Sequence, residues 1–543
     1  MLGLILSIFL VPLIIIFNSY FLGKLIRRKN ISVNGYIATV IGFFIFISVM
    51  FLFFTLLYIS KVAILVYLSF FLAIQVALIG IYIWNYRYAF ISWKLKAKPL
   101  IHFLLIFALA IVYLVIIILY AYHTEAVSPV EFGQPGDEMF RLINAFTSRA
   151  FNKYDSIVWF GDLSGNFSFQ SFSIFAAFAA IFMPLFKIPN EYVYEYLFWQ
   201  QVITFAVIFA CATTGFFYNR FNRSNVCLVF ALIPISLLLL LLSFMFYESP
   251  IVGDSWISIP IILYCYQMFK RVHVDADYSI NILAFIVIGL SALDINLTLL
   301  TILLLIFNFC YASLKNMNPV GQIIYLFFPL MYLVFVWAPM SSSIPYIVML
   351  TICLVGALAM FLLYTRGFMK ITISRINGIV SKHPFAIIGL FTLVIYVLSI
   401  FLLVTVFDYK FSWQLWPEAL YQHIWGISTQ QYTNFPLYLN TISWGVIFCI
   451  LVVCVVLLAT KKVKLSQSPY LILILVMIIL FVNPLSLNIF FKLNSDGYFT
   501  LFDIGLINFL VLVPLLLWFN NHISKSKVFT LKPKELWNEQ QSK

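Results

Sequence analysis

"NGYIATVIGFFIFISVMFLFFTLLY", residues 34–58, carries no charged side chain and exceeds the roughly 20 apolar residues that a helix needs to cross a bilayer. Similar runs recur along the whole chain of 543 residues, which is 64% hydrophobic and 9% charged and has a mean hydropathy of +1.05. A soluble protein has too little interior for so many apolar side chains. Only helices and closed barrels span lipid, and the sequence lacks the short alternating pattern of barrel strands. We therefore predict an all-α polytopic membrane protein.

The apolar runs predict about 14–15 transmembrane helices. The first run lacks a basic region before it and a cleavage site after it, so we expect a retained helix rather than a signal peptide. The run at 172–186 is short, and we expect a re-entrant or juxtamembrane helix on the outer side; an ordinary span is the alternative. The expected spans lie near 1–22, 34–58, 62–85, 101–122, 196–218, 225–246, 256–269, 279–296, 298–314, 320–338, 343–364, 384–406, 441–460, 468–490 and 500–520.

Charged residues are distributed unevenly between the two sides of these spans. With the N-terminus outside, all but seven of the 32 Lys and Arg residues fall in one set of loops, which the positive-inside rule assigns to the cytoplasm. Only four of the 19 acids fall there. We therefore predict a multi-pass protein of the cell membrane with an outer N-terminus and a cytoplasmic tail. The basic residues left outside are Lys61, Arg141, Arg149, Lys153, Lys187, Lys410 and Lys492.

The predicted outer loops are acidic and rich in Trp and Tyr, and the longest of them contains "PGDEMFRLINAF", residues 135–146. After the Pro-Gly break, apolar residues recur at helical spacing from Met139, which predicts an amphipathic helix over 137–151 lying in the membrane interface. Asp137 would then stand at the helix N-cap, with Glu138 complementing the helix dipole, which is a purely structural role. The outer loops are 123–195, 247–255, 407–440 and 491–499.

This loop and the segments after it resemble the integral-membrane glycosyltransferases of the GT-C superfamily, such as protein mannosyltransferases and aminoarabinose transferases. The matching pieces are "PGDEMFRLINAF", "SIFAAFAAIFMPLF" and "EYVYEYLFWQQVITFAVIFACATTGFFYNRFNR". Two features differ: three spans precede the helix that would ordinarily come first, and the short segment lacks a Pro-Pro-Leu-Tyr-like start. The resemblance divides the chain into a three-helix extension (1–99), a GT-C-like catalytic module (100–225), a C-terminal bundle (226–520) and a tail (521–543).

The resemblance implies transfer of a sugar from a polyprenyl-phosphate carrier to a glycan, lipid or protein acceptor on the outer face. A carboxylate base must take the acceptor proton, and Asp137 is the candidate, with Glu138 orienting the acceptor or stabilising positive charge on the sugar. The leaving phosphate needs cationic partners, of which Arg141 comes first. The remaining candidates for substrate binding are Asp155, Asp162, Glu248, Asp254, Lys410, Trp413, His423, Lys492 and Asp496.

No cofactor is expected, although scattered loop acids leave a divalent ion open. All seven cysteines fall inside apolar runs, so we expect neither disulfides nor a zinc site. Motifs of ATPases, zinc proteases, thiol oxidoreductases and α/β-hydrolases are missing from the sequence. Ile- and Lys-rich composition is typical of a low-GC bacterium, which would make undecaprenyl phosphate the carrier.

Three other function classes remain open. A transporter or flippase of lipid-linked saccharides would need ionisable residues in mid-span and paired broken helices, and the sequence offers almost none of the former. A polysaccharide polymerase or ligase would also act outside, but it would more naturally carry an Arg-rich outer loop, which this sequence lacks. A non-enzymatic assembly factor would need none of these features.

Overall fold

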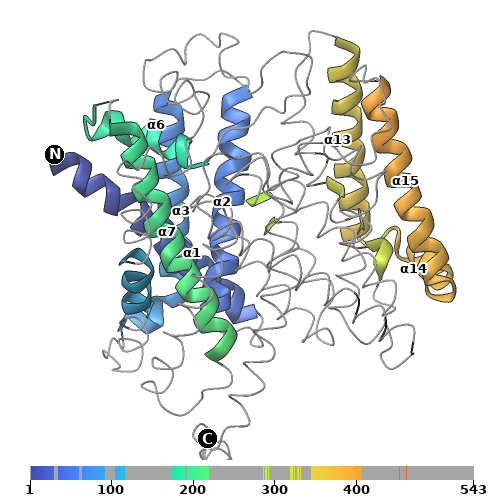
Figure 1. The fold of residues 1–543 in the computed structure, drawn as a ribbon, viewed down its shortest axis with the longest axis horizontal. Coiled ribbons are helices and arrows are strands. Elements are labelled where there is room, and N and C mark those ends of the chain that lie inside the picture. The colour runs from blue at the N-terminus through green and yellow to red at the C-terminus, as the bar shows by residue number, and fades with distance from the viewer. Residues whose placement is uncertain are drawn as a thin grey trace, which may run out of the picture.

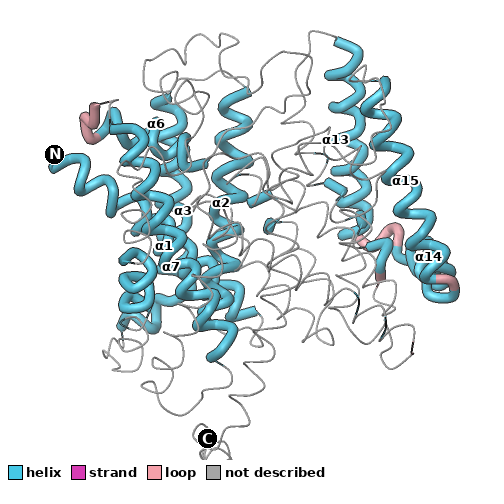
Figure 2. Tube along the Cα trace, viewed as in Figure 1, coloured by secondary structure: helices cyan, strands magenta, loops and turns pink. Residues whose placement is uncertain are grey.

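The structure is a computed structural model, and 93% of the residues that it describes are helical, with no strand among them (Figures 1 and 2). This agrees with the predicted all-α class. The described residues are 2–29, 35–59, 64–91, 104, 106–115, 174–189, 192–218, 285–286, 288–289, 292, 318–321, 323–324, 327–328, 331, 344–405, 452, 456 and 460.

Three described helices are long and apolar enough to cross a membrane: α1 (Leu2–Lys29), α2 (Gly35–Ile59) and α3 (Ile64–Ile91). They confirm the helices predicted near 1–22, 34–58 and 62–85. Three more follow the predicted ranges closely: α7 (Val193–Tyr218), α13 (Ile344–Thr365) and α15 (Pro384–Thr405). At 1.5 Å per residue, even the shortest of the six is about 33 Å long, enough for the hydrocarbon core. The total number of spans remains a prediction.

α1 and α2 pack most closely through small residues on both helices. Ser19 and Gly23 in α1, and Ala38 and Gly42 in α2, are each four residues apart and so share a helix face. A Cβ on Gly42 would overlap the carbonyl oxygen of Ser19 and lie 2.6 Å from the nitrogen of Gly23. In lipid no hydrophobic force drives helices together, so close backbone contact between small residues supplies the attraction through van der Waals packing.

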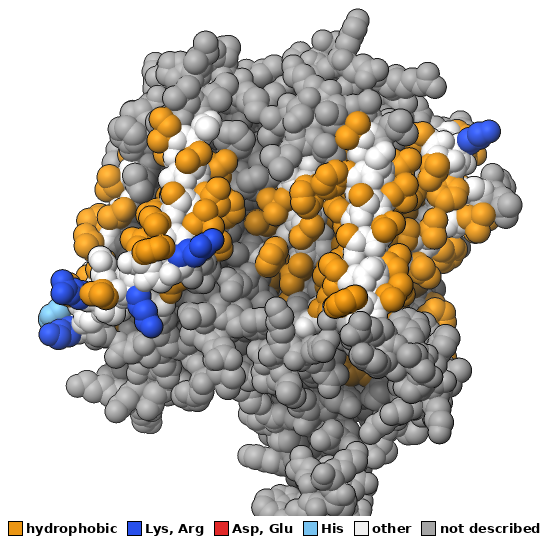
Figure 3. Space-filling model, turned by 180° about the vertical axis from the view of Figure 1, so that it is seen from behind, with side chains coloured by type: hydrophobic (Ala, Val, Ile, Leu, Met, Phe, Trp, Pro, Cys, Tyr) orange, Lys and Arg blue, Asp and Glu red, His pale blue; other side chains and the backbone are white. Residues whose placement is uncertain are grey.

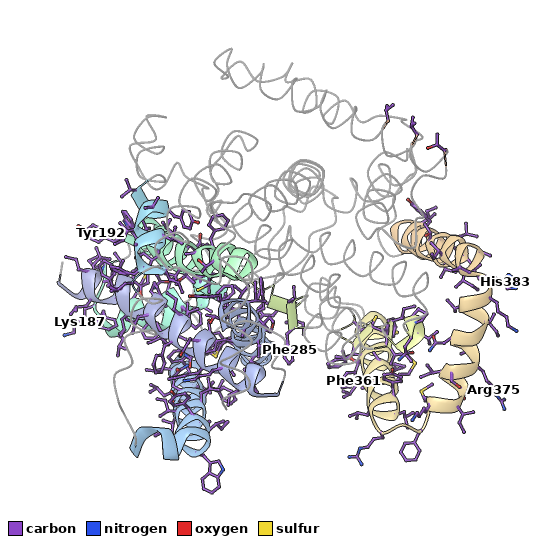
Figure 4. All side chains as sticks on the ribbon, turned by 90° about the horizontal axis from the view of Figure 1, so that it is seen from below. Lys187, Tyr192, Phe285, Phe361, Arg375 and His383 are labelled. Atoms are coloured by element: carbon purple, nitrogen blue, oxygen red, sulfur yellow. The ribbon has the colours of Figure 1, made fainter. Side chains whose placement is uncertain are left out.

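Polar side chains add hydrogen bonds between helices of this bundle. The Asn18 amide of α1 donates to the Gln75 side-chain oxygen of α3 at 2.7 Å. The Ser48 hydroxyl of α2 bonds to the carbonyl oxygen of Phe285, so the described residues around 285–292 pack on α2 (Figure 4). Gly289 lies against the same site, because a Cβ there would be 3.0 Å from the Ser48 oxygen. The first bond joins α1 to α3, and the second holds the stretch around Phe285 against α2.

The short run predicted to be re-entrant or juxtamembrane forms α6 (Ile174–Leu185), a helix of 12 residues. At 1.5 Å per residue it is about 18 Å long, too short for the roughly 30 Å hydrocarbon core. Most of its described side chains are buried within the protein, including Ile174, Phe178 and Met183 at 0% exposure. The described helix is therefore shorter than an ordinary span, and most of it is enclosed by the neighbouring helices.

Aromatic contacts fix where α6 lies along the bundle. The Phe178 ring centroid is 6.0 Å from that of Phe54, near the end of α2, and 5.9 Å from that of Phe71, near the start of α3. Phe175 packs on Phe205 of α7 at 5.5 Å. α6 thus lies at the end of the bundle where α2 ends and α3 begins. Figure 1 shows it in the upper part of the view, whereas α14 lies at the lower ends of α13 and α15.

α6 and α13 end in the same hydrogen-bonded turn but with different residues in the left-handed position. After α6, the Ile188 N–H donates to the Met183 carbonyl at 2.9 Å, and Lys187 has φ +54°. After α13, the Phe368 N–H donates to the Leu363 carbonyl at 3.1 Å, and Gly367 has φ +79°. These are Schellman caps, in which glycine avoids the Cβ strain that lysine incurs.

This difference predicts opposite effects of two substitutions on stability. Lys187→Gly should stabilise the protein by about 1 kcal/mol, and Gly367→Ala should destabilise it by a similar amount, because left-handed backbone costs an L-residue roughly 1–2 kcal/mol. Thermal unfolding of the purified protein in detergent measures both changes. Lys187→Ala is the control, since it removes the charge but keeps a Cβ; a stabilisation equal to that of the glycine variant would refute the backbone explanation.

Between α13 and α15, where the sequence predicts a basic cytoplasmic loop, the structure has a further helix, α14 (Lys370–Lys382). This helix was not among the predicted elements. Its apolar residues are few and interleaved with Lys and Arg, so the segment resembles a charged loop. Only the spacing of the apolar residues within this segment indicates a helix.

Candidate functional site

The predicted catalytic pair, Asp137 and Glu138, lies outside the described residues, as does the predicted amphipathic helix over 137–151. The same holds for every predicted substrate-binding residue. These are Arg141, Asp155, Asp162, Glu248, Asp254, Lys410, Trp413, His423, Lys492 and Asp496. Their roles and their proximity to one another therefore remain predictions.

The structure does describe the last part of the predicted catalytic loop, from α6 to the start of α7. We call α6, residues 186–189 and the first turns of α7 the α6 rim. The chain turns tightly here, with the Tyr192 N–H donating to the Pro189 carbonyl at 3.1 Å. The start of α1 abuts this turn, since a Cβ on Gly3 would be 2.6 Å from the Phe186 carbonyl oxygen. The end of the predicted loop is thus packed firmly against the N-terminal helix.

Lys187 projects from the α6 rim and is exposed. Figure 4 places it on the same edge of the N-terminal bundle as Tyr192. It was not among the predicted binding residues, although it is one of the seven basic residues on the predicted outer side. An exposed ammonium group at this rim can bind a phosphate approaching from solvent or from a lipid headgroup.

A buried polar row leads from the α6 rim into the bundle. Tyr196, Gln200 and Thr204 are four residues apart on one face of α7, and Ser7 of α1 lies beside the Tyr196 hydroxyl. The Gln200 and Thr204 side chains have 0% exposure; within the described part of the chain Gln200 lies beside the Tyr196 hydroxyl, whereas the Thr204 hydroxyl has no hydrogen-bond partner. Buried polar groups within a membrane bundle are costly and commonly mark functional positions. Sequence reasoning missed this row because Gln and Thr carry no charge.

Cations gather at the end of the N-terminal bundle opposite the α6 rim. The last turns of α1 carry Lys24, Arg27, Arg28 and Lys29, and the Lys24 amine lies 5.5 Å from the ring centroid of Tyr20. Among the described residues the one acid is Glu195, which lies at the α6 rim. The end of α1 is therefore the basic end of this part of the bundle, and the orientation itself remains a prediction.

Within the described ranges, no three His, Cys, Asp or Glu residues come together as a potential metal site. No protein-family model, no curated protein and no solved structure matches this chain. The resemblance to the GT-C superfamily therefore rests on the sequence motifs alone and remains a prediction.

Proposed function

We propose that this protein is an integral-membrane glycosyltransferase that moves a sugar from a polyprenyl-phosphate carrier to an acceptor on the outer face of the membrane. In this reaction the acceptor O–H bond breaks and its oxygen forms a new bond to C1 of the sugar. The bond between C1 and the phosphate oxygen breaks, and polyprenyl phosphate leaves with the bonding electrons. Asp137 takes the acceptor proton, and Glu138 orients the acceptor or stabilises positive charge on the sugar ring.

The position of α6 is the observation that most supports this proposal. A short apolar helix directly after an acidic loop has no use as a span, yet α6 is buried against α2, α3 and α7 at one end of the bundle. That end lies opposite the basic end of α1, which the positive-inside rule assigns to the cytoplasm. This arrangement supports the proposal that the loop carrying Asp137 is anchored at the outer surface, where a lipid-linked sugar would present its C1.

The leaving phosphate requires cations on the outer side, where the sequence supplies few. Arg141 is one turn beyond Asp137 in the predicted interfacial helix, and Lys410, His423 and Lys492 come from later loops. Lys187 joins these candidates because it is exposed at the α6 rim, next to the loop that carries the base. A cation there stabilises the charge that develops as the C1–oxygen bond breaks.

The decisive assay follows a radiolabelled sugar supplied on polyprenyl phosphate to vesicles that contain the full-length protein and a membrane extract as the source of acceptor. We expect label on the acceptor together with an equal amount of free polyprenyl phosphate. Movement of the intact donor across the membrane without release of carrier would instead identify a flippase. A lengthened saccharide that stays on its carrier would identify a polymerase.

Cysteine labelling of intact cells tests the orientation on which the proposal rests. A single cysteine introduced at position 138 should react with a membrane-impermeant maleimide added outside cells, whereas one at position 463 should react only after permeabilisation. Labelling of position 463 but not of position 138 in intact cells would place the predicted catalytic loop in the cytoplasm and would exclude the proposed reaction.

A further inference from the structure

α14 differs from the other long helices of the structure in both composition and direction. It connects the end of α13 at Thr365 to the start of α15 at Pro384. Figures 1 and 4 show that it turns away from the direction of both neighbours and crosses between their lower ends. A helix in this position runs along the membrane surface if α13 and α15 span the bilayer.

Hydrogen bonds hold α14 in a defined position against the rest of the protein. The Asn377 amide donates to the side-chain oxygen of Asn318 at 2.6 Å, and the Val320 N–H donates to the side-chain oxygen of Asn377 at 3.2 Å. Asn318 in turn donates to the Tyr364 hydroxyl of α13 at 2.6 Å. Ile373 and Val380, with 4% and 3% exposure, bury the same side of α14. The opposite side is thereby kept facing outward.

The outward side of α14 combines cations with exposed apolar side chains. Ile371, Arg375 and Ile379 are four residues apart and form one row, in which the two isoleucines are 71% and 57% exposed. Lys370 and Lys382 are exposed at the two ends of the helix. Figure 3 shows such blue side chains beside orange surface at the lower end of these helices. Long basic side chains over apolar neighbours are typical of the headgroup region, where the stem stays in the apolar layer and the charge reaches phosphate.

This positive charge has no counterpart in the surrounding sequence. Between Asp294 and Asp408 the chain contains no Asp or Glu, whereas Arg366, Lys370, Arg375 and Lys382 all lie at or in α14. Clusters of four or more Lys and Arg next to a transmembrane helix attract anionic lipids. An acidic protein would satisfy the charge but would leave the exposed isoleucines in water, while a lipid surface satisfies both.

We propose that α14 is a binding surface for anionic phospholipid headgroups. The guanidinium of Arg375 and the amines of Lys370 and Lys382 contact the lipid phosphates, and the isoleucine row lies at the boundary with the acyl chains. Because α14 is hydrogen-bonded to α13 through Asn318, bound lipid also stabilises the packing of this part of the protein. This inference is independent of the proposed transfer reaction.

Binding of short-chain phosphatidylglycerol and phosphatidylcholine to the full-length protein in detergent, counted by native mass spectrometry, tests this proposal. We expect preferential binding of phosphatidylglycerol. Arg375→Gln should weaken the affinity of the protein for phosphatidylglycerol about fivefold, which is the effect of one cation at an anionic surface. A triple variant that adds Lys370→Gln and Lys382→Gln should weaken this affinity further. The three residues are exposed, so an unchanged thermal midpoint in phosphatidylcholine is expected and verifies folding.

Two control variants decide whether the effect belongs to α14. Exchanging Lys and Arg at the same three positions (Lys370→Arg, Arg375→Lys, Lys382→Arg) keeps the charge and should keep the preference. A second triple variant removes the same amount of charge from α1 (Arg27→Gln, Arg28→Gln, Lys29→Gln). It should keep most of the preference for phosphatidylglycerol. An equal loss in the α1 variant, no preference in the natural protein, or full displacement of the lipid by inorganic phosphate would each overturn the proposal.

Discussion

Asp137→Asn is expected to reduce sugar transfer about 10²- to 10⁴-fold, the usual contribution of a general base, while membrane expression stays normal. Asparagine has nearly the shape of aspartate but cannot accept the proton that the acceptor hydroxyl loses. Transfer of labelled sugar in the vesicle assay measures the change. The donor should still bind, so the loss is expected in kcat rather than in KM.

This substitution also separates catalysis from the alternative, structural role of Asp137. At a helix N-cap, Asn is about as good as Asp. If Asp137 only caps the helix, the Asn variant should therefore keep its sugar-transfer activity and the Ala variant should lose it. A base would lose its activity in both variants. Glu195→Gln is the matched control, since Glu195 is an acid at the α6 rim with no proposed role in the reaction. Normal transfer by Asp137→Asn would remove Asp137 as the base.

The membrane helices could be predicted from sequence because their signal is local. A run such as residues 34–58 is apolar all round, and its length alone determines that it forms a helix in lipid, so α2 begins and ends within a residue of the predicted span. α6 was separable from the spans for the same reason: its apolar run is too short. Its burial between α2, α3 and α7 could not be predicted, since that depends on contacts between residues more than 100 positions apart, such as Phe54 and Phe178.

The features that the sequence did not reveal depend on the partner of each residue. Ser19 and Gly23 are ordinary small residues until Ala38 and Gly42 are known to face them. α14 resembled a charged loop because the side of the helix that it buries is fixed by contacts with residues distant in sequence, such as the hydrogen bonds of Asn377 with Asn318 and Val320. Gln200 and Thr204 are polar but uncharged, so a search for ionisable groups passes over them.

For the candidate site, the sequence predicts chemistry more readily than geometry. An acidic pair after a Pro-Gly break and a scarcity of outer cations suggest a base and its phosphate partners, since these roles follow from residue type and from the side of the membrane. Whether Asp137 and Lys410 share one cavity is a question of tertiary contacts between loops far apart in the chain, and both residues lie outside the described ranges.

Gly42→Leu is expected to destabilise the protein by about 3 kcal/mol, at the upper end of the usual cost of overpacking. Even the first carbon of the new side chain would overlap the Ser19 carbonyl oxygen, which is backbone and cannot rotate away. α1 and α2 would have to separate, and the van der Waals contact that holds them together in lipid would be lost. Thermal unfolding in detergent, followed by size-exclusion chromatography of the surviving protein, measures the loss.

Gly80→Leu and Gly356→Leu are the matched controls, because a Cβ at either glycine would meet nothing within 4 Å. Both should unfold close to the natural protein, since an added leucine there faces open space. Gly23→Leu separates α1 and α2 at the same contact as Gly42→Leu. The double variant should therefore lose clearly less stability than the sum of the losses of the two single variants. If the Gly42→Leu and Gly80→Leu variants unfold at the same temperature, the small residues do not determine how α1 packs on α2.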